Sequence, residues 1–494
     1  MDTSAPSPAT KYEAVIGLEV HAQLTTASKA FCSCSTTYGA QPNVNVCPVC
    51  LGHPGVLPVL NQNLVAFAVR MGLATNCEIR RISTFSRKNY YYPDLPKGYQ
   101  ITQYADPICH DGHVEIETES GAKSIGITRI HMEEDSGKSI HDLDIDTLVD
   151  LNRAGVPLIE IVSEPDIRTP QEAYQYLQQM RQILIYLGIC DGNLEEGSMR
   201  CDANISVRLK GSTSFGTKRE VKNLNSFRNV EKAIDFEIND QIALLEGGGQ
   251  VVQQTRMWDA GAQKTKVMRS KEQAHDYRYF PEPDLGPVVV DHERLEELRR
   301  TIPELSLAKK RRFTEQYHLP SYDAAIFVDD IDVATYYEET CGLLASPGAE
   351  TYKLTSNWIM TDILRIMGER KCSVNDVGLT PRQLASIVDV IADGTISSKT
   401  AKDVFPDMLG TGRTAPELIE ERGLKQVSDP SALLAMVQNV IQSNPDNVQK
   451  YKDGKTNLLG FFVGQVLKAS GGTANPAMVT QLMKEALESS TVNP

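Results

Sequence analysis

The spacing of apolar residues changes once along the chain, near residue 290, and this change decides the fold class. Before it, short runs alternate apolar and polar residues, and Gly, Pro, Asn and Asp separate the runs. Such alternation is typical of strands with one buried face. After it, apolar residues recur every three or four positions, as in amphipathic helices. The sequence therefore predicts an α+β protein, with an N-terminal domain rich in antiparallel sheet followed by helices.

Helix-start signals refine this division. Thr169, Pro170 and Glu172 form a capping box at the start of a helix that interrupts the strand-rich region and ends near Gly188. A second capping box at residues 380–383 opens a helix in the later region. We expect three domains: residues 1–292 rich in sheet, residues 293–395 helical, and residues 396–494 a small all-α tail.

Composition narrows the class of protein. The formal net charge of −14 excludes a non-specific basic coat for nucleic acid, but it permits a local phosphate-binding face. We find neither a run of about 18 apolar residues nor the pattern of a secretory or organelle-targeting leader. The sequence predicts a cytoplasmic protein.

Four of the ten cysteines lie close together, as CSC at residues 32–34 and CPVC at residues 47–50. Each short pair can place two thiolates on one metal ion, and the loop between the pairs is long enough to close a tetrahedron. Cys32, Cys34, Cys47 and Cys50 therefore predict a structural zinc site with no open coordination position. The alternatives are four buried free thiols, or a redox CxxC motif, for which the βαβ context is missing.

Acidic residues and histidines gather in three further places. Glu19 and His21 are two positions apart on a predicted strand, so their side chains share a face. Residues 131–138, HMEEDSGK, place three acids and a lysine beside a histidine, and Asp202 adjoins another predicted strand. Carboxylate oxygens with an occasional imidazole suit Mg2+, the usual companion of nucleotide phosphates. For any single acid, the alternative is a solvated surface carboxylate.

A basic and aromatic segment, RKNYYYPDLPKGY at residues 87–99, suits phosphate contact and base stacking, or else forms a Tyr-rich hairpin. The P-loop, the Rossmann fingerprint and the nucleophile elbow are absent from the sequence. Nucleotide chemistry in this chain would therefore need a different, metal-centred site.

Residues 148–166, LVDLNRAGVPLIEIVSEPD, resemble the signature of the B subunit of the aspartyl-tRNA(Asn)/glutamyl-tRNA(Gln) amidotransferase. Other segments share the resemblance, which extends over essentially the whole chain from residue 12. They are VIGLEVH at 15–21, RKNY at 87–90, HMEED at 131–135, EGSMRCDANIS at 196–206, KNLNS at 222–226, DYRYFPEPD at 276–284 and LLGFFVGQV at 458–466.

The resemblance implies a cradle-shaped N-terminal kinase domain that holds the aminoacyl end of tRNA, and a tRNA-binding C-terminal tail. Such a protein uses ATP and Mg2+ to phosphorylate the side-chain carboxylate of misacylated Glu-tRNA(Gln) or Asp-tRNA(Asn). Ammonia from an amidase (glutaminase) partner subunit then displaces phosphate, and a small third subunit completes a heterotrimer. The chemistry agrees with the sequence, because a carboxylate becomes a good acyl donor only after such activation and this chain lacks a glutaminase motif.

The resemblance also implies roles for individual residues. Glu19, His21, Glu133 and Glu134 would line the Mg2+ site, with Asp202 as a further ligand. We assign Lys138, Arg87 and Lys88 to phosphate contact from their charge and position alone. The zinc prediction rests on cysteine spacing, since some members of the family lack the four cysteines.

Two other functions compete with this one. The chain could be a tRNA-binding scaffold that no longer phosphorylates, although its charged clusters argue against a dead site. It could also be a self-sufficient zinc hydrolase, but a site of four cysteines leaves no open position for water.

Overall fold

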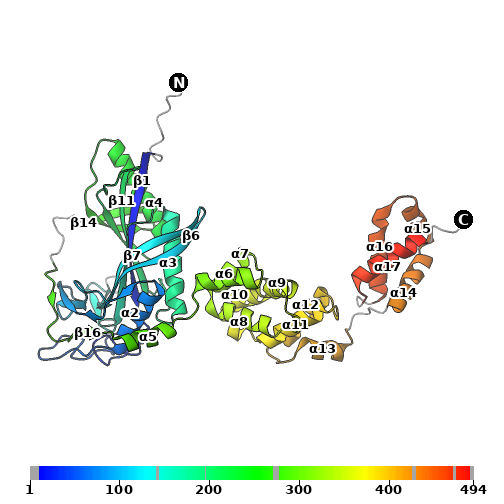
Figure 1. The fold of residues 1–494 in the computed structure, drawn as a ribbon, viewed down its shortest axis with the longest axis horizontal. Coiled ribbons are helices and arrows are strands. Elements are labelled where there is room, and N and C mark those ends of the chain that lie inside the picture. Colours follow the sequence, from blue (N-terminus) through cyan, green and yellow to red (C-terminus); the bar gives the residue numbers. More distant parts are fainter. Residues whose placement is uncertain are drawn as a thin grey trace, which may run out of the picture. The chain divides into compact units, whose positions relative to one another are not determined.

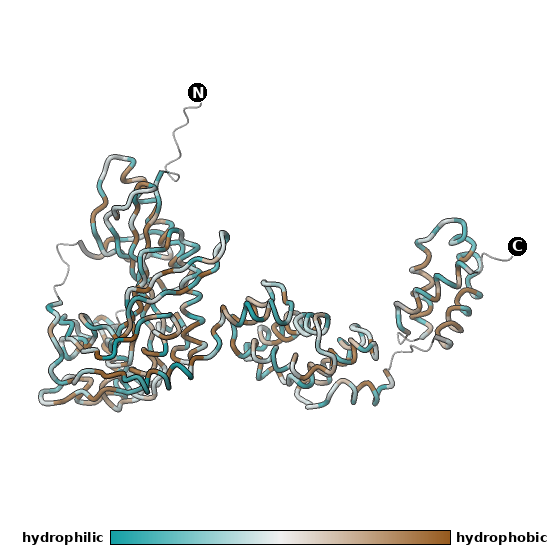
Figure 2. The backbone as a smooth tube through the Cα atoms, viewed as in Figure 1, coloured by the Kyte–Doolittle hydropathy of each residue, from teal (hydrophilic) through white to brown (hydrophobic). Residues whose placement is uncertain are grey.

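A computed structural model describes residues 11–140, 144–194, 196–270, 277–424, 430–470 and 474–489. The chain divides after Leu305 into two compact units. The first contains the strands and the second is helical (Figure 1). Figure 2 shows apolar residues recurring along the strands and along the helices. This arrangement confirms the predicted α+β class.

A 12-stranded sheet organises the described part of the first unit. Its main path runs β14-β13-β12-β11-β1-β10-β7-β5-β4-β15, and β6 pairs with β7 and β2 off this path. The strands of the main path are β14 (Lys264–Ser270), β13 (Gln254–Asp259), β12 (Arg219–Leu224), β11 (Met199–Leu209), β1 (Tyr12–Gln23), β10 (Pro157–Ser163), β7 (Gly121–Glu134), β5 (Tyr99–Thr102), β4 (Ser86–Asn89) and β15 (Phe280–Pro281). The remaining strands are β2 (Glu78–Ile79) and β6 (Cys109–Thr118), the pair β3 (Ile82–Ser83) and β16 (Val288–Val289), and the pair β8 (Lys138–Ile140) and β9 (Leu148–Asp150).

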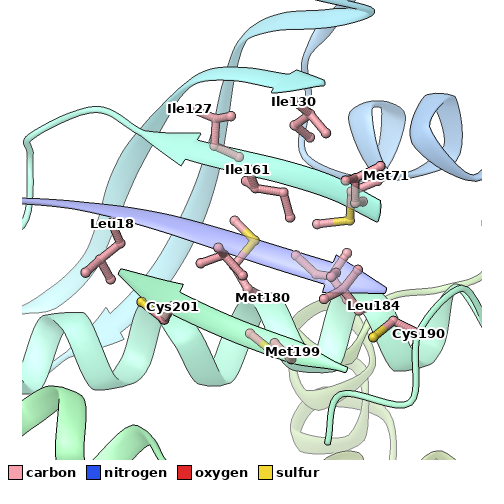
Figure 3. Close-up of a cluster of buried hydrophobic side chains, with 14 of the residues drawn as sticks. Leu18, Met71, Ile127, Ile130, Ile161, Met180, Leu184, Cys190, Met199 and Cys201 are labelled. Atoms are coloured by element: carbon pink, nitrogen blue, oxygen red, sulfur yellow. The ribbon is translucent and has the colours of Figure 1, made fainter. Parts of the chain in front are cut away.

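Long helices pack on one face of this sheet. They are α2 (Gln62–Ala74), α3 (Pro170–Tyr186) and α4 (Phe227–Glu246), and the short α5 (His292–Arg300) packs on α2. Leu18 of β1, Ile161 of β10 and Cys201 of β11 face Met180 and Leu184 of α3 in the buried core (Figure 3). Successive strand residues point to opposite faces. The core thus fixes which residues of β1, β10 and β11 point to the other face.

The predicted start and end of the interrupting helix agree with α3. The Thr169 side chain accepts a hydrogen bond from the Glu172 backbone N–H, and Pro170 is the first helical residue. Glu172 does not close the box on Thr169, because its carboxylate accepts from the Arg168 backbone N–H instead. Gly188 follows the helix with φ of +64°, the left-handed conformation that favours glycine there.

The second unit consists of helices α6 (Ser306–Gln316), α7 (Ser321–Asp329), α8 (Ile331–Gly342), α9 (Ala349–Trp358), α10 (Leu364–Arg370), α11 (Pro381–Ala392), α12 (Ser398–Met408), α13 (Ala415–Arg422), α14 (Pro430–Gln442), α15 (Pro445–Lys452), α16 (Leu459–Ala469) and α17 (Pro476–Ser489). The Thr380 and Gln383 capping box forms as predicted. One buried cluster spans residues 313–419 and another spans 433–487. The first of these continues past residue 395. The domain limits at 292/293 and 395/396 stay a prediction.

A buried ion-pair network anchors α4 to the edge of the sheet. Glu237 of α4 is 0% exposed and contacts Arg219 of β12 at 3.1 Å and Arg256 of β13 at 3.3 Å. Thr265 of β14 donates a hydrogen bond to the same carboxylate at 2.5 Å. One carboxylate therefore joins a helix to three neighbouring strands.

Glu237→Ala is expected to destabilise the first unit by about 1–3 kcal/mol, because it removes the fully buried partner of two arginines that still pair with Asp240. The loss should appear as a lower denaturation midpoint for that unit. The control is Asp235→Ala, an exposed acid of the same helix, which should change the midpoint by about 0.5 kcal/mol or less. Equal losses of stability in the two variants would show that the buried network contributes no more to stability than an exposed acid does.

Candidate active site

The candidate site lies on the face of the large sheet that points away from the helix-covered core. On β1, Leu18 and Val20 enter the core, so Gly17, Glu19 and His21 point to the other face. Strand pairing places Glu160 of β10 opposite His21. The prediction that Glu19 and His21 share a face is confirmed.

Three side chains from three strands form what we call the His21 cluster: His21, Glu133 and Glu160. They offer ligand atoms within 4.8 Å of one another, and both carboxylates are buried. His21 Nε2 lies 3.3 Å from Glu160 Oε2, and Thr102 donates a hydrogen bond of 2.7 Å to Glu133. The buried His131 lies 3.2 Å from Glu133 and 3.5 Å from Glu160. A divalent cation could replace the histidine protons as the partner of these carboxylates.

Electrostatics keep both carboxylates ionised. Burial alone would raise the pKa of Glu133, but Lys88 and the hydrogen bond to His131 lower it to about 2. Burial is likewise outweighed at Glu160, where His131 and His21 hold the pKa well below its usual range. Burial would lower the pKa of His21, and contact with Glu160 raises it instead. The cluster is thus strongly attractive to positive charge.

A second group, the Glu19 cluster, adjoins the first on β1. Glu19, Asp202 of β11 and Glu220 of β12 also hold ligand atoms within 4.8 Å of one another. Burial, followed by the charges of Glu160 and Asp202, raises the pKa of Glu19. Lys222 forms ion pairs with Asp202 and with Glu220, the latter at 2.8 Å. Carboxylates and a cation therefore alternate along this face.

Other predicted site residues lie apart from the clusters. Glu134 is the neighbour of Glu133 on β7, and it pairs with Lys97 and accepts from the Ile101 backbone N–H at 2.9 Å. Lys138 is exposed at the start of β8. The structure does not bring these two residues into either cluster, and their roles stay predictions.

The two basic candidates of β4 differ in their surroundings. Lys88 lies 5.2 Å from the Tyr277 ring, and burial, which alone would lower its pKa, is outweighed by Glu133, so the pKa is raised. The Arg87 guanidinium instead pairs with the buried Glu282 at 2.7 Å and with Asp284 at 3.1 Å. Lys88 is therefore close to the carboxylates of the His21 cluster. Arg87 instead holds β4 to the segment around β15.

The four cysteines of the zinc prediction come together. Cys32, Cys34, Cys47 and Cys50 place their sulfurs within 4.8 Å of one another. The Cys47 and Cys50 sulfurs are 3.9 Å apart. A tetrahedral ion with Zn–S bonds of about 2.3 Å would set neighbouring sulfurs about 3.8 Å apart. The donor set and its spacing fit zinc.

A buried lysine accompanies this cysteine cluster. Lys29 is 0% exposed, and its Nζ lies 3.7 Å from Cys50 Sγ and 3.3 Å from the Leu151 carbonyl oxygen. Four thiolates around one Zn2+ carry a net charge of −2, which an ammonium group partly offsets. Cys50 and Lys29 also line a cavity of about 200 Å³ together with Lys97 and Glu134.

Comparison with known proteins identifies the family. The model of the GatB/GatE catalytic domain matches residues 14–296, and that of the GatB domain matches residues 336–487. The chain belongs to the family of tRNA amidotransferase B subunits. Relatives named as the B subunit of aspartyl/glutamyl-tRNA(Asn/Gln) amidotransferase include those of Thermodesulfovibrio yellowstonii, 52% identical, and Myxococcus xanthus, 53% identical. The matches cover 97% of this chain and 100% and 99% of those relatives, respectively.

The family assignment confirms the resemblance seen in the sequence. The matched region for the catalytic domain contains both acidic clusters and the four cysteines. Among the described helices, none has the length and the apolar run that crossing a bilayer requires.

Sequence reasoning did not assign Glu160, Glu220 or Lys222 to the site, and it noted His131 beside the acids without giving it a role. Glu160 carried a usable signal, because it interrupts an otherwise apolar strand, LIEIV, whose glutamate must be paired if buried. Glu220 and Lys222 carried a weaker one, the alternation of charge in the strand REVKNL. Their proximity to Asp202 follows from strand order, which the sequence does not reveal.

Proposed function

We propose that this chain is the subunit that activates misacylated tRNA in a glutamine-dependent amidotransferase, a ligase forming a carbon–nitrogen bond. The side-chain carboxylate of Glu-tRNA(Gln) or Asp-tRNA(Asn) attacks the γ-phosphate of ATP, giving an acyl phosphate and ADP. Ammonia then attacks the acyl carbon, and phosphate leaves with one oxygen of the original carboxylate. The observation that carries the proposal is the paired acidic clusters with Lys88 and Lys222 on one face, in a chain of this family.

The donor set supports Mg2+ at this face. His21, Glu133 and Glu160 would hold one ion, and Glu19 and Asp202 would bind a second ion or contact the first through water. Bound Mg2+ would neutralise charge on the transferring phosphoryl group. Lys88 would contact a phosphate oxygen, and Lys222, which pairs with Asp202, would restrain that carboxylate. We also propose the predicted metal role for Glu134 and the predicted phosphate roles for Lys138 and Arg87.

Zinc is proposed as a structural ion at the four cysteines. It would fix the loop of residues 32–50 against β9 and the segment that follows it. Asn152 supports this arrangement through both ends of its side-chain amide. The amide nitrogen donates to the Gln41 backbone carbonyl oxygen at 2.7 Å, and the amide oxygen accepts from the Asn45 backbone N–H at 2.8 Å. The site leaves no position for a reacting water, which argues against a zinc hydrolase.

The proposal includes partners. An amidase (glutaminase) subunit would supply ammonia, a small third subunit would complete the heterotrimer, and the helical second unit would hold tRNA(Gln) or tRNA(Asn). We propose the cytoplasm as the location, in keeping with the acidic composition.

ATP consumption by the assembled enzyme tests this function against the scaffold alternative. With Glu-tRNA(Gln) and no ammonia source, we expect ADP formation that uncharged tRNA(Gln) does not support. A complex that binds Glu-tRNA(Gln) but never consumes ATP would identify the chain as a scaffold instead.

A further inference from the structure

The four-cysteine cluster borders the cavity of about 200 Å³. Cys32 and Cys50 line this cavity together with the buried Lys29. A water molecule occupies about 30 Å³ in the liquid, and hydrogen peroxide is only slightly larger, so the cavity has room for it. A small oxidant therefore has access to two sulfurs of the cluster, although Cys50 as a whole is only 5% exposed.

The sulfurs at this cavity are arranged for disulfide formation. Within the CPVC segment, the Cys47 and Cys50 sulfurs lie 3.9 Å apart. The Lys29 Nζ lies 3.7 Å from the Cys50 sulfur, where its charge favours the thiolate and offsets the charge of a departing hydroxide. A sulfur that is accessible, lies beside a cation and has a second cysteine within reach is typical of redox-sensitive sites.

A short segment, residues 151–156, connects the cysteine cluster to the end of β7. On the cluster side, the Leu151 carbonyl oxygen accepts a hydrogen bond from Lys29 at 3.3 Å. Asn152 binds the loop of residues 32–50 through both ends of its side-chain amide. The order of the cysteine loop is therefore passed to the 151–156 segment through direct hydrogen bonds.

The same segment contacts the residues that end β7 and follow it. The Gly155 backbone N–H donates to the Asp135 carbonyl oxygen at 2.8 Å. A Cβ at Gly155 would lie 3.6 Å from Cys50 Cβ and 3.7 Å from Glu134 Oε2, so this glycine lies between the cysteine cluster and the strand. Because β7 also carries Glu133 of the His21 cluster, a displacement of the segment would disturb the acidic site.

We propose that Cys50 and Cys47 form an oxidation site through which hydrogen peroxide switches the enzyme off. The Cys50 thiolate attacks one peroxide oxygen, the O–O bond breaks, and hydroxide leaves, which gives a sulfenic acid at Cys50. The Cys47 thiolate then attacks the Cys50 sulfur and displaces a second hydroxide, closing a disulfide. The two thiolates lose two electrons in total, and the peroxide gains them.

The inference rests on the proposed zinc site and on the proposed ATP-dependent reaction. A disulfide offers no thiolate, so oxidation would remove half of the ligands of the zinc ion. We expect the ion to dissociate and the 151–156 segment to lose its support. ADP formation should then fall about 10- to 100-fold, because a displacement of about 1 Å at a catalytic group costs roughly that much.

The test treats the assembled enzyme with hydrogen peroxide beside a chromogenic zinc chelator, and then measures ADP formation with Glu-tRNA(Gln). Mass spectrometry of unreduced peptides locates the disulfide. The matched variant is Cys47→His, because three cysteines and one histidine also bind zinc, but a histidine forms no disulfide with Cys50. Cys372, a partly exposed thiol of the second unit outside the cluster, is the internal control for general oxidation.

We expect zinc release, the Cys47–Cys50 disulfide and the loss of ADP formation to follow one time course. A dithiol reductant with added zinc should reverse all three, and the glutaminase activity of the partner should persist throughout. Cys47→His should keep its zinc and its own untreated rate after the same exposure. If Cys47→His does not bind zinc, the disulfide map of the wild-type enzyme and its reversal decide.

Cysteines of the cluster that stay reduced and keep zinc while Cys372 is oxidised would overturn the proposal. A Cys47–Cys50 disulfide that leaves ADP formation unchanged, or a disulfide between other cysteines, would overturn it as well. Two failures are visible before peroxide is added. A wild-type chain without zinc refutes the proposed zinc site, and a zinc-loaded enzyme that never consumes ATP refutes the proposed function; the switch fails in either case.

Discussion

Glu133→Gln is expected to lower ATP turnover by the assembled enzyme about 100- to 1,000-fold, the usual effect of removing one preorganised electrostatic contact from a transition state. Glutamine keeps the size of the side chain and removes only its charge. The wild-type site keeps Glu133 ionised, because Lys88 and His131 outweigh burial and hold the pKa of Glu133 at about 2. The measurement is kcat for ADP formation with Glu-tRNA(Gln), across a range of Mg2+ concentrations.

The matched control is Glu78→Gln, an exposed glutamate of β2 that belongs to neither acidic cluster. It should retain wild-type kcat. Binding of Glu-tRNA(Gln) and the glutaminase activity of the partner should survive in both variants, which separates a lost metal site from a lost fold. If Glu133→Gln kept wild-type kcat and an unaltered Mg2+ requirement, the His21 cluster would have no part in the mechanism.

Cys50→Ser is expected to reduce bound zinc from one ion per chain to near zero. Binding of structural zinc contributes about 10–16 kcal/mol in small zinc domains, and it requires the full ligand set. The loop of residues 32–50 should then lose its order, and the melting temperature of the first unit should fall by about 5 °C or more. Metal analysis after dialysis and a thermal melt provide the two measurements.

Cys372→Ser is the matched control, because Cys372 lies in the second unit, outside the four-cysteine cluster. It should retain zinc and melt as wild type does. Zinc that remains in Cys50→Ser at full occupancy, or a wild-type chain that carries no zinc after expression with the metal supplied, would contradict the structural role.

Local features of the fold were readable from the sequence. The Thr169 cap, Pro170 and the left-handed Gly188 determine where α3 starts and ends, and each acts through neighbours a few residues away. The spacing of the four cysteines also predicted their meeting, because each pair is short and one loop joins the two. The shared face of Glu19 and His21 follows from the period of a strand alone.

The composition of the site was less accessible, because it depends on which strands become neighbours. Glu160 meets His21 only because β10 pairs with β1, and those residues are far apart in the sequence. Arg87 was assigned to phosphate contact from its charge, and that role stays a prediction. Its pairing with Glu282 and Asp284, almost two hundred residues later, depends on which strands become neighbours. Conversely, the separation of Glu134 from Glu133 could have been foreseen, since adjacent residues of a strand point to opposite faces.

Oxygen transfer from substrate to phosphate tests the central claim most directly. Glu-tRNA(Gln) labelled with 18O in the γ-carboxylate is converted by the assembled enzyme with ATP and ammonia, and the inorganic phosphate is analysed by mass spectrometry. Activation of the carboxylate by phosphorylation predicts one 18O atom in each phosphate formed from fully labelled substrate. Gln-tRNA(Gln) formed alongside phosphate that carries no 18O would show that the carboxylate is never phosphorylated, and the account given for this chain would be wrong.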